Sequence, residues 1–534
     1  MALEISYPTT FRDGISWLAW MVLIVPTLYV LCKSIYQITF HPLARYPGPF
    51  LAKFTNLYSV YHAWIGDRHL DIHRCHERYG ESVISSAPLS LFANQSVGPI
   101  VRFAPNGLSF NSSTAYHTIY GFKANNRKSD FYLLFAPPGH PSVFSDTNKD
   151  SHAKKRKVLS YAFSDKAMRN MEEYMLQHVR TFCSKIGTSN AVNVAQWTEY
   201  LSFDVMGELA FGQSLGMLLG SSNTYVLDLI VNSAHYCQMS GLGRAFHNLG
   251  LGMLMFPKLM QDKVRFRGFS HKYAGDRVKV VGDRKDFYHY LLKATDKETG
   301  EKFGTPELVA QANVIIIGGA ETTATAMAAL LFYLGQDAQA LAKATKEVRE
   351  AFASQGVEAI RSGAALSSCQ YLRACIDEAM RCTPPISGIL PRKVLPGGMV
   401  IDGNKIPAGV DVGVSAYALH HNPDIYPEPF EYRPERWIAS EGTSKQDVDA
   451  AKSNFAGFST GPRSCVGMPL GYLEMMITTA RVLFQFDLKL ASSLGGGSPE
   501  SPVGRRRKGE FQIQDNFVAA HDGPLIQFTP AQAS

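Results

Sequence analysis

The chain has 534 residues, of which 46% are hydrophobic and 19% charged, so it can bury a large core. Its formal net charge is +7, spread thinly apart from basic clusters at 154–157 and 505–508. No nucleic-acid motif accompanies the clusters, so we interpret them as solvated surface and expect no nucleic-acid partner. The eight cysteines include no Cys-x-x-Cys pair, which argues against a disulfide framework or zinc site and favours a reducing compartment.

The amino-terminal region predicts a membrane anchor. The 18 residues from Ile15 to Cys32 carry no charge, and a helix needs ~17–25 such residues to span a bilayer. Trp20 and Tyr29 suit the interfaces. The stretch is longer than a typical signal-peptide core and no small-residue cleavage site follows, so we favour an anchor over a cleaved signal. Lys33 and Arg45 follow it, which places the rest of the chain in the cytoplasm.

The remainder of the chain reads as one large domain. Residues 1–40 form the anchor and its lead-in, and a proline-rich segment, 41–49, stiffens the chain behind it. No linker or internal repeat divides residues 41–534, which we therefore assign to a single domain. One stretch, Glu81 to Val97, is Ser/Ala-rich with weak periodicity. It is either an atypical surface insertion or an unspliced intron translated in the gene model.

The stretch from Val309 to Leu334 is apolar and long enough to suggest a second membrane span. Glu321 near its middle would cost roughly 2.5–3.5 kcal/mol at a bilayer centre, so a buried helix of a soluble core is the better interpretation. The pair Gly318-Gly319 weakens the helix but leaves room for a flat cofactor and a small ligand. The hydroxyl of Thr322 can distort the helix locally, and Glu321 can carry protons. A small-residue surface for helix packing is the alternative.

Glu378 and Arg381 are three residues apart and would lie on one face of a helix. Such pairs are common on solvated helices and are weak signals alone. Here apolar residues flank the pair and a proline-rich segment ends the helix, which favours burial.

The most informative feature is the segment Phe458-Ser-Thr-Gly461-Pro-Arg463-Ser-Cys465-Val-Gly467. Cys465 lies in a glycine-flanked turn before a helix, where the backbone N–H groups favour a thiolate. The glycines let the backbone approach a flat group closely, and Arg463 can bind a carboxylate. These features suit a haem with its iron on the sulfur and a propionate on the arginine. A structural cysteine in a glycine-rich loop is the alternative.

These ten residues match the haem-binding signature Phe-x-x-Gly-x-Arg-x-Cys-x-Gly, and the chain resembles the cytochrome P450 family, in particular fungal microsomal (class II) monooxygenases of secondary metabolism. The resemblance runs from about His41 to Phe528. It implies a mainly α fold with small β-sheets (α+β) and a haem b whose iron takes Cys465 as axial ligand. Phe458, Gly461, Arg463 and Gly467 would be further haem-binding residues.

The resemblance also assigns roles to residues elsewhere. Gly318 to Thr323 resembles the oxygen-activation motif, in which Thr322 would contact dioxygen and Glu321 would help to deliver two protons. Glu378 and Arg381 resemble the Glu-x-x-Arg pair, and Arg436 would complete a buried structural network with them. The propionate contacts would be His152, Arg156 and Arg392, although a surface histidine is the alternative for His152.

By this resemblance the chain is a catalytic haem-thiolate monooxygenase that inserts one oxygen atom from O₂ into a lipophilic small molecule. Electrons would come from NADPH through NADPH-cytochrome P450 reductase, with cytochrome b5 as a further candidate partner. Lys154, Lys155 and Lys157 would steer the acidic reductase toward the cysteine side of the haem. The location would be the endoplasmic reticulum membrane, single-pass, with the catalytic domain facing the cytosol.

The substrate is the least specified property. By analogy the pocket would use residues 131–144, 227–256, 318–321, 386–390 and 516–518, most of them apolar. A terpenoid or polyketide intermediate fits best. A simple aromatic acid held by Arg244 or His247 is an alternative. Two other functions stay open, a reductase-independent isomerase or dehydratase acting on a peroxide and a non-enzymatic haem carrier, and Glu321 and Thr322 argue against both.

Overall fold

The computed structural model describes residues 11–80, 100–137, 139–187, 190–279, 284–293 and 303–531. The predicted insertion, Glu81 to Val97, lies outside these residues. Helices form most of the described fold and the sheets are small, so the predicted α+β class is confirmed. The helices are α1 (Phe11–Thr39), α2 (Leu57–Trp64), α3 (Arg68–Gly80), α4 (Ser113–Tyr120), α5 (Lys149–Ala162), α6 (Asp165–Ile186), α7 (Val194–Phe211), α8 (Tyr225–Leu242), α9 (Arg244–Asn248), α10 (Leu251–Met255), α11 (Pro257–Lys279), α12 (Phe287–Lys293), α13 (Thr305–Gln336), α14 (Ala338–Phe352), α15 (Ala364–Ser368), α16 (Gln370–Cys382), α17 (Ala416–His420), α18 (Lys445–Ser453) and α19 (Met468–Gln485).

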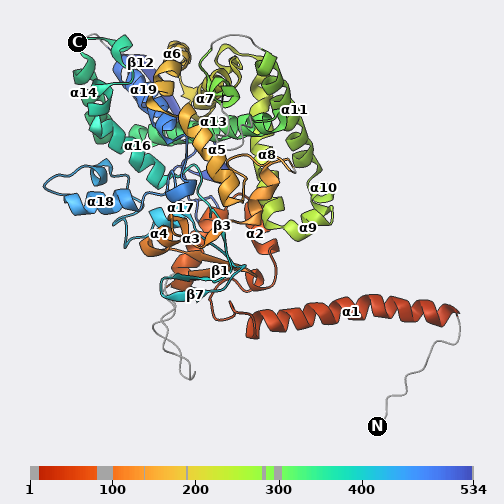
Figure 1. Ribbon diagram of the computed structural model, residues 1–534. Coiled ribbons are helices and arrows are strands. Elements are labelled where there is room, and N and C mark those ends of the chain that lie inside the picture. The colour runs from red at the N-terminus through yellow and green to blue at the C-terminus, as the bar shows by residue number, and fades with distance from the viewer. Residues whose placement is uncertain are drawn as a thin grey trace.

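The largest sheet has the strand order β1-β2-β8-β5-β3 and lies toward the lower end of the molecule in Figure 1. A second sheet, β4-β12-β9, and the hairpins β10-β11 and β6-β7 complete the β structure of the described residues. The strands are β1 (Ile100–Ala104), β2 (Gly107–Phe110), β3 (Asn126–Lys128), β4 (Val192–Asn193), β5 (Arg392–Val394), β6 (Met399–Ile401), β7 (Asn404–Ile406), β8 (Asp411–Val414), β9 (Phe486–Ser492), β10 (Ile513–Asn516), β11 (Val518–His521) and β12 (Leu525–Pro530).

Helix α13 crosses the centre of the domain and packs against α7, α11, α16 and α19 (Figure 1). Pro306 occupies its first turn, where a missing N–H costs nothing. Asp337 ends it and caps α14 by accepting hydrogen bonds from the N–H groups of Gln339 and Ala340. Its apolar window is 72% buried within the domain, which agrees with the interpretation as a core helix rather than a second span.

Helix α1 has the opposite surroundings. It projects from the domain (Figure 1), and its stretch Trp20–Thr39 is long and apolar enough to cross a membrane while only 6% of its apolar window is buried. The lead-in behind it is attached to the sheet by Arg102 of β1. The guanidinium of Arg102 is fully buried and donates hydrogen bonds to Gln37 and to the carbonyls of Leu43 and Pro105.

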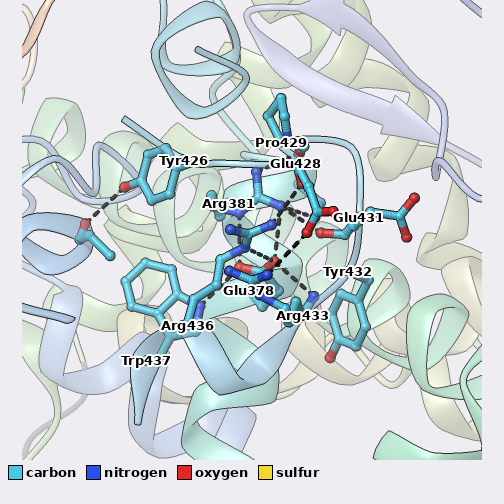
Figure 2. Close-up of polar contacts among 12 residues, drawn as sticks. Glu378, Arg381, Tyr426, Glu428, Pro429, Glu431, Tyr432, Arg433, Arg436 and Trp437 are labelled. Atoms are coloured by element: carbon cyan, nitrogen blue, oxygen red, sulfur yellow. Dashed lines mark hydrogen bonds and ion pairs between the residues drawn. The ribbon is translucent and has the colours of Figure 1, made fainter. Parts of the chain in front are cut away.

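A buried ion network joins α16 to the irregular segment 428–437 (Figure 2). The carboxylate of Glu378 accepts hydrogen bonds from Nε and Nη2 of Arg381, at 2.8 and 2.9 Å, and from Nε of Arg436 at 3.1 Å. The indole N–H of Trp437 adds a bond of 3.0 Å. Burial alone would raise the pKa of Glu378, but the two guanidinium groups hold it below its usual value. The structure thus brings together the three residues that the sequence suggests as a structural network.

We expect Arg381→Gln to destabilise the chain by about 3–5 kcal/mol, because it leaves a buried carboxylate undercompensated. Arg433→Gln is the matched control, since its side chain forms a largely exposed pair with Glu428 that contributes about 1 kcal/mol or less. Thermal unfolding of both variants beside the wild type measures the difference. Equal losses in the two variants would contradict a special role for the buried network.

Candidate functional site

A cavity of about 350 Å³ lies between α13 and the segment before α19. Its wall includes Gly318 and Thr322 from α13, Phe458 and Cys465 from the glycine-rich segment, and Arg392 of β5. The structure therefore brings the oxygen-activation motif and the cysteine motif, 143 residues apart from Thr322 to Cys465 in the sequence, to one space.

Cys465 is held at this cavity by hydrogen bonds of its own loop. Its N–H donates to the carbonyl of Phe458 at 2.8 Å, and its side chain is exposed to the cavity. Burial raises the pKa of the Cys465 thiol, and the N–H groups of Gly467 and Met468 with the charge of Arg156 lower it only in part. The helix N-terminus alone is thus insufficient to favour a thiolate, contrary to the expectation from sequence. A metal cation on the sulfur would supply the missing stabilisation.

His420 supports this loop from behind. One neutral tautomer of His420 satisfies both ring contacts: Nδ1–H donates to the carbonyl of Arg381 at 3.0 Å, and Nε2 accepts the N–H of Ala456 at 2.8 Å. Burial, with the nearby Arg381, lowers the pKa of His420 to about 3, which keeps this tautomer uncharged. Its ring also stacks on Phe455, with centroids 5.4 Å apart. The buried network is thereby connected to the segment that leads to Cys465.

The glycines of the two motifs have different neighbours. Gly461 has φ +70°, and a Cβ there would lie 2.1 Å from the carbonyl oxygen of Tyr120, so this glycine serves packing against α4 rather than the cavity. A Cβ on Gly318 would meet open space, whereas one on Gly319 would strike Met206 of α7 at 2.6 Å. Gly467 borders the cavity, and a Cβ added to it would lie 3.8 Å from the Sγ of Cys465.

Positive charge gathers at one part of the cavity wall. The lining cationic or basic residues there are Lys128, His152, Arg156, Arg392 and Arg463. Burial and then Arg392 lower the pKa of Arg463 to about 10, and burial and then Arg463 lower that of His152 to about 3. The group therefore lacks sufficient negative charge of its own. Two carboxylates such as haem propionates would satisfy it, so the residues present fit a haem.

Lys128 is a site residue that sequence reasoning missed. It lies on β3 directly opposite Arg392 of β5 in the antiparallel register. Its ammonium donates to the carbonyl of Phe144 and lies 4.2 and 4.1 Å from the ring centroids of Tyr132 and Phe144. Burial, followed by the charges of Arg392 and Arg463, lowers its pKa well below the usual range. Only the pairing of two short strands places it here, and no local motif indicates it.

The helix α5 supplies His152 and Arg156, as the spacing predicts. Asn148 caps this helix by accepting hydrogen bonds from the N–H groups of Asp150 and Ser151. Arg156 donates to the carbonyl of Ser464, next to Cys465. Lys155 differs from the expectation, because it is buried and its Nζ lies 2.7 Å from Asp146. It is therefore not a docking residue, whereas the side chains of Lys154 and Lys157 are exposed.

The acid and the hydroxyl of the α13 motif have different surroundings. Thr322 borders the cavity and donates from Oγ1 to the carbonyl of Gly318 at 2.6 Å. Glu321 is 1% exposed, is not part of the cavity wall, and lies close to Glu199 of α7 and His521 of β11. Burial and then Glu199 raise the pKa of Glu321 well above its usual value. Neither Glu199 nor His521 belongs to a motif, so the sequence did not point to them.

The remaining wall is largely apolar. Each segment expected from the sequence contributes to it, among them Phe135, Phe144, Ala234, Ile386 and Phe517. Helix α11 adds Lys263, Phe266 and Arg267, which were not expected. Arg244 and His247 were proposed as carboxylate partners, but neither lines the cavity. Arg244 instead pairs with Asp130 at 3.3 Å.

Comparison with known proteins decides the family. The family model described as "Cytochrome P450" matches residues 109–502. The chain belongs to the cytochrome P450 family. It is 34% identical to "Cytochrome P450 monooxygenase AKT7" of Alternaria alternata, over 94% of this chain and 95% of that protein. It is 35% identical to "Cytochrome P450 monooxygenase fscF" of Fusarium equiseti, over 99% of this chain and 98% of that protein.

A solved structure, "Crystal structure of cytochrome P450DA heme domain", has the same fold with a TM-score of 0.64. The two chains are 18% identical, and the match covers 80% of this chain and 88% of the solved one. The chain is accordingly a cytochrome P450 monooxygenase, and the family implies a haem held by a cysteine thiolate. The predicted family, fold class and enzyme class are confirmed.

We expect Lys128→Met to weaken haem retention about tenfold or more, because a charged hydrogen-bond donor contributes roughly 1.5–3 kcal/mol. Lys149→Met is the control, since Lys149 is an exposed lysine of the neighbouring α5. Haem transfer to an apoglobin measures the loss rate in each variant. A second readout is the stability of the haem-free chain, which separates a lost haem contact from a general loss of stability. Unchanged haem loss would remove Lys128 from the propionate site.

Proposed function

We propose that this chain is a membrane-anchored haem-thiolate monooxygenase that oxidises a lipophilic small molecule in fungal secondary metabolism, with NADPH-cytochrome P450 reductase as electron donor. The observation that carries the proposal is the shared cavity of Cys465 and Thr322, with excess positive charge on its wall. The apolar helix Trp20–Thr39 supports the membrane anchor and an endoplasmic reticulum location. Organisms named for its relatives, such as Alternaria alternata, support the fungal assignment.

In this function the chain's residues bind and orient the cofactor. The Cys465 sulfur would bind the iron, and Arg392, Arg463 and Lys128, with His152 and Arg156, would hold the propionates. A bound haem would activate dioxygen and supply the oxidising power for C–H oxidation. The Thr322 hydroxyl would orient a small ligand at α13, and Glu321 would hold a proton for it because burial keeps its carboxyl group neutral.

The apolar wall supports a lipophilic substrate. Phe135, Phe144 and Phe517 form one aromatic cluster at the cavity, with centroids 4.6–5.5 Å apart. Burying an apolar ligand against such rings is favourable and excludes water from the reacting centre. A terpenoid or polyketide scaffold fits this wall. An aromatic acid would need a cation, and Lys263 or Arg267 of α11 would supply it in place of Arg244 and His247.

The first experiment is the difference spectrum of the reduced protein with carbon monoxide. The wild type should show a thiolate-type Soret band, and Cys465→Ser should lose both this band and NADPH-dependent turnover, because serine cannot provide the thiolate. Cys375→Ser is the control, since Cys375 is a buried core residue of α16. A thiolate-type band in Cys465→Ser would contradict the assignment. Activity without NADPH and reductase would instead indicate an isomerase or dehydratase.

The reductase surface has its own test. We expect Lys154→Glu with Lys157→Glu to raise the reductase concentration needed for half-maximal turnover several-fold, because exposed lysines steer an acidic partner. The effect should shrink at high salt while the haem spectrum stays unchanged. Lys346→Glu, on the exposed face of α14, is the control. If turnover depends on reductase concentration as in the wild type, docking at this part of α5 is disproved.

The substrate is found by comparing metabolites of the host with and without the gene. An accumulated compound that the purified enzyme converts with NADPH and reductase would be the substrate. Retention of that compound in the apolar cavity is expected to depend on the aromatic cluster of Phe135, Phe144 and Phe517.

A further inference from the structure

Three ionisable side chains meet beside α13, and none of them is among the residues that line the cavity. Glu199 of α7, Glu321 of α13 and His521 of β11 each offer one oxygen or nitrogen atom, and these atoms all lie within 4.8 Å of one another. Helices α7 and α13 pack along each other (Figure 1), and β11 also packs against α13. The cluster is therefore assembled by three elements that are far apart in the sequence.

The burial of the cluster is graded from the surface inward. Glu199 and His521 are half-buried residues, whereas Glu321 is only 1% exposed. Both carboxylate oxygens of Glu321 and the Nε2 atom of His521 are buried and lack a hydrogen-bond partner among the described residues. His521 is oriented by its other nitrogen, Nδ1, which lies 3.4 Å from the Oγ1 of Thr325. Because no hydrogen bond holds the Glu321 carboxyl group, its rotation breaks none.

The charges around the cluster favour bound protons. Burial and then the charges of Asp228 and Asp522 raise the pKa of Glu199 to about 7. Asp228 comes from α8 and Asp522 directly follows β11, so acidic groups of two further elements act on Glu199, and Glu199 itself acts on Glu321 of α13. Burial lowers the pKa of His521 to about 4, so its ring is neutral. Two close, buried carboxyl groups share protons rather than ionise together.

We propose that Glu199 is the solvent-side group of a proton relay that recharges Glu321, and that His521 positions the shared proton between them. The Glu199 carboxyl group gives its proton to the Glu321 carboxylate, which becomes neutral. Glu199 is left ionised and takes a new proton from solvent water. The neutral Glu321 then turns about its side-chain bonds toward the Thr322 side of α13. Glu199 and His521 are positioning residues, because they act only through Glu321.

The relay rests on the proposed function, which needs protons at the cavity, but its first test is independent of turnover. Glu199 holds its proton in the folded chain up to a pH of about 7, whereas an unfolded glutamate releases it near about 4.3. The wild type should therefore lose stability as pH rises through this window. The glutamine of Glu199→Gln cannot titrate. The apparent Tm of this variant, relative to that of the wild type, should therefore rise by roughly 2 °C from about pH 5 to about pH 7.5.

The second test uses NADPH oxidation by the holoenzyme with reductase and dioxygen, so it needs no identified substrate. Glu199→Gln should lower the rate about tenfold or more, lose the inflection that the wild type shows near pH 7, and enlarge the solvent deuterium effect. Asp228→Asn should keep the inflection but move it to lower pH, because one negative charge facing Glu199 is removed. His521→Asn should slow oxidation in the same direction as Glu199→Gln.

The control for a merely structural effect is Glu474→Gln. Glu474 of α19 is also buried, burial raises its pKa to about 8, and it accepts a hydrogen bond from Ser202 at 2.7 Å. The Glu474→Gln variant should change the stability of the chain but leave the pH profile of NADPH oxidation unchanged. If Glu199→Gln keeps the wild-type profile and deuterium effect while the carbon-monoxide band is normal, the relay alone is wrong. If the wild type lacks that band, the proposed function fails and the relay fails with it.

Discussion

A buried carboxylate, Glu378, is the constraint on which the site depends. It can stay ionised in the core only because two guanidinium groups and an indole N–H surround it. Arg381 connects this carboxylate to its surroundings, because its carbonyl accepts a hydrogen bond from Nδ1–H of His420 and its side chain donates one to the carbonyl of Pro429. Nε2 of His420 in turn accepts a hydrogen bond from the N–H of Ala456, two residues before Phe458. The position of Cys465 is therefore supported by hydrogen bonds that begin 87 residues earlier, at Glu378.

The same core leaves charge imbalances at the two places where chemistry is expected. Cations gather beside the cavity without matching carboxylates, and carboxyl groups gather behind α13. Each imbalance is costly in a low-dielectric interior unless a ligand or a proton compensates for it. The cations fit an anionic cofactor, and the carboxyl groups fit stored protons. Such imbalances lower the stability of the chain, and they are common at sites that bind a ligand or transfer a proton.

The sequence predicted much of this because several motifs are local. Cys465 and the residues around it share one turn, and Glu378 and Arg381 share one helix face, so spacing alone was informative. The α13 helix could be recognised as buried from the single charge of Glu321 in an apolar run. Lys128 could not be recognised, because only the register between β3 and β5 brings it beside Arg392. The burial of Lys155 likewise depends on Asp146, which no periodicity relates to it.

Helical geometry explains why Glu321 and Thr322 cannot act from the same position. Consecutive residues of an α-helix are about 100° apart around its axis, so a threonine that borders the cavity turns the preceding acid toward α7 and β11. Glu321 is accordingly buried outside the residues that line the cavity. In the proposed relay, a proton held on Glu321 is replaced from Glu199 of α7 and delivered toward Thr322. The half-buried Glu199 is the carboxyl group through which this relay would reach solvent.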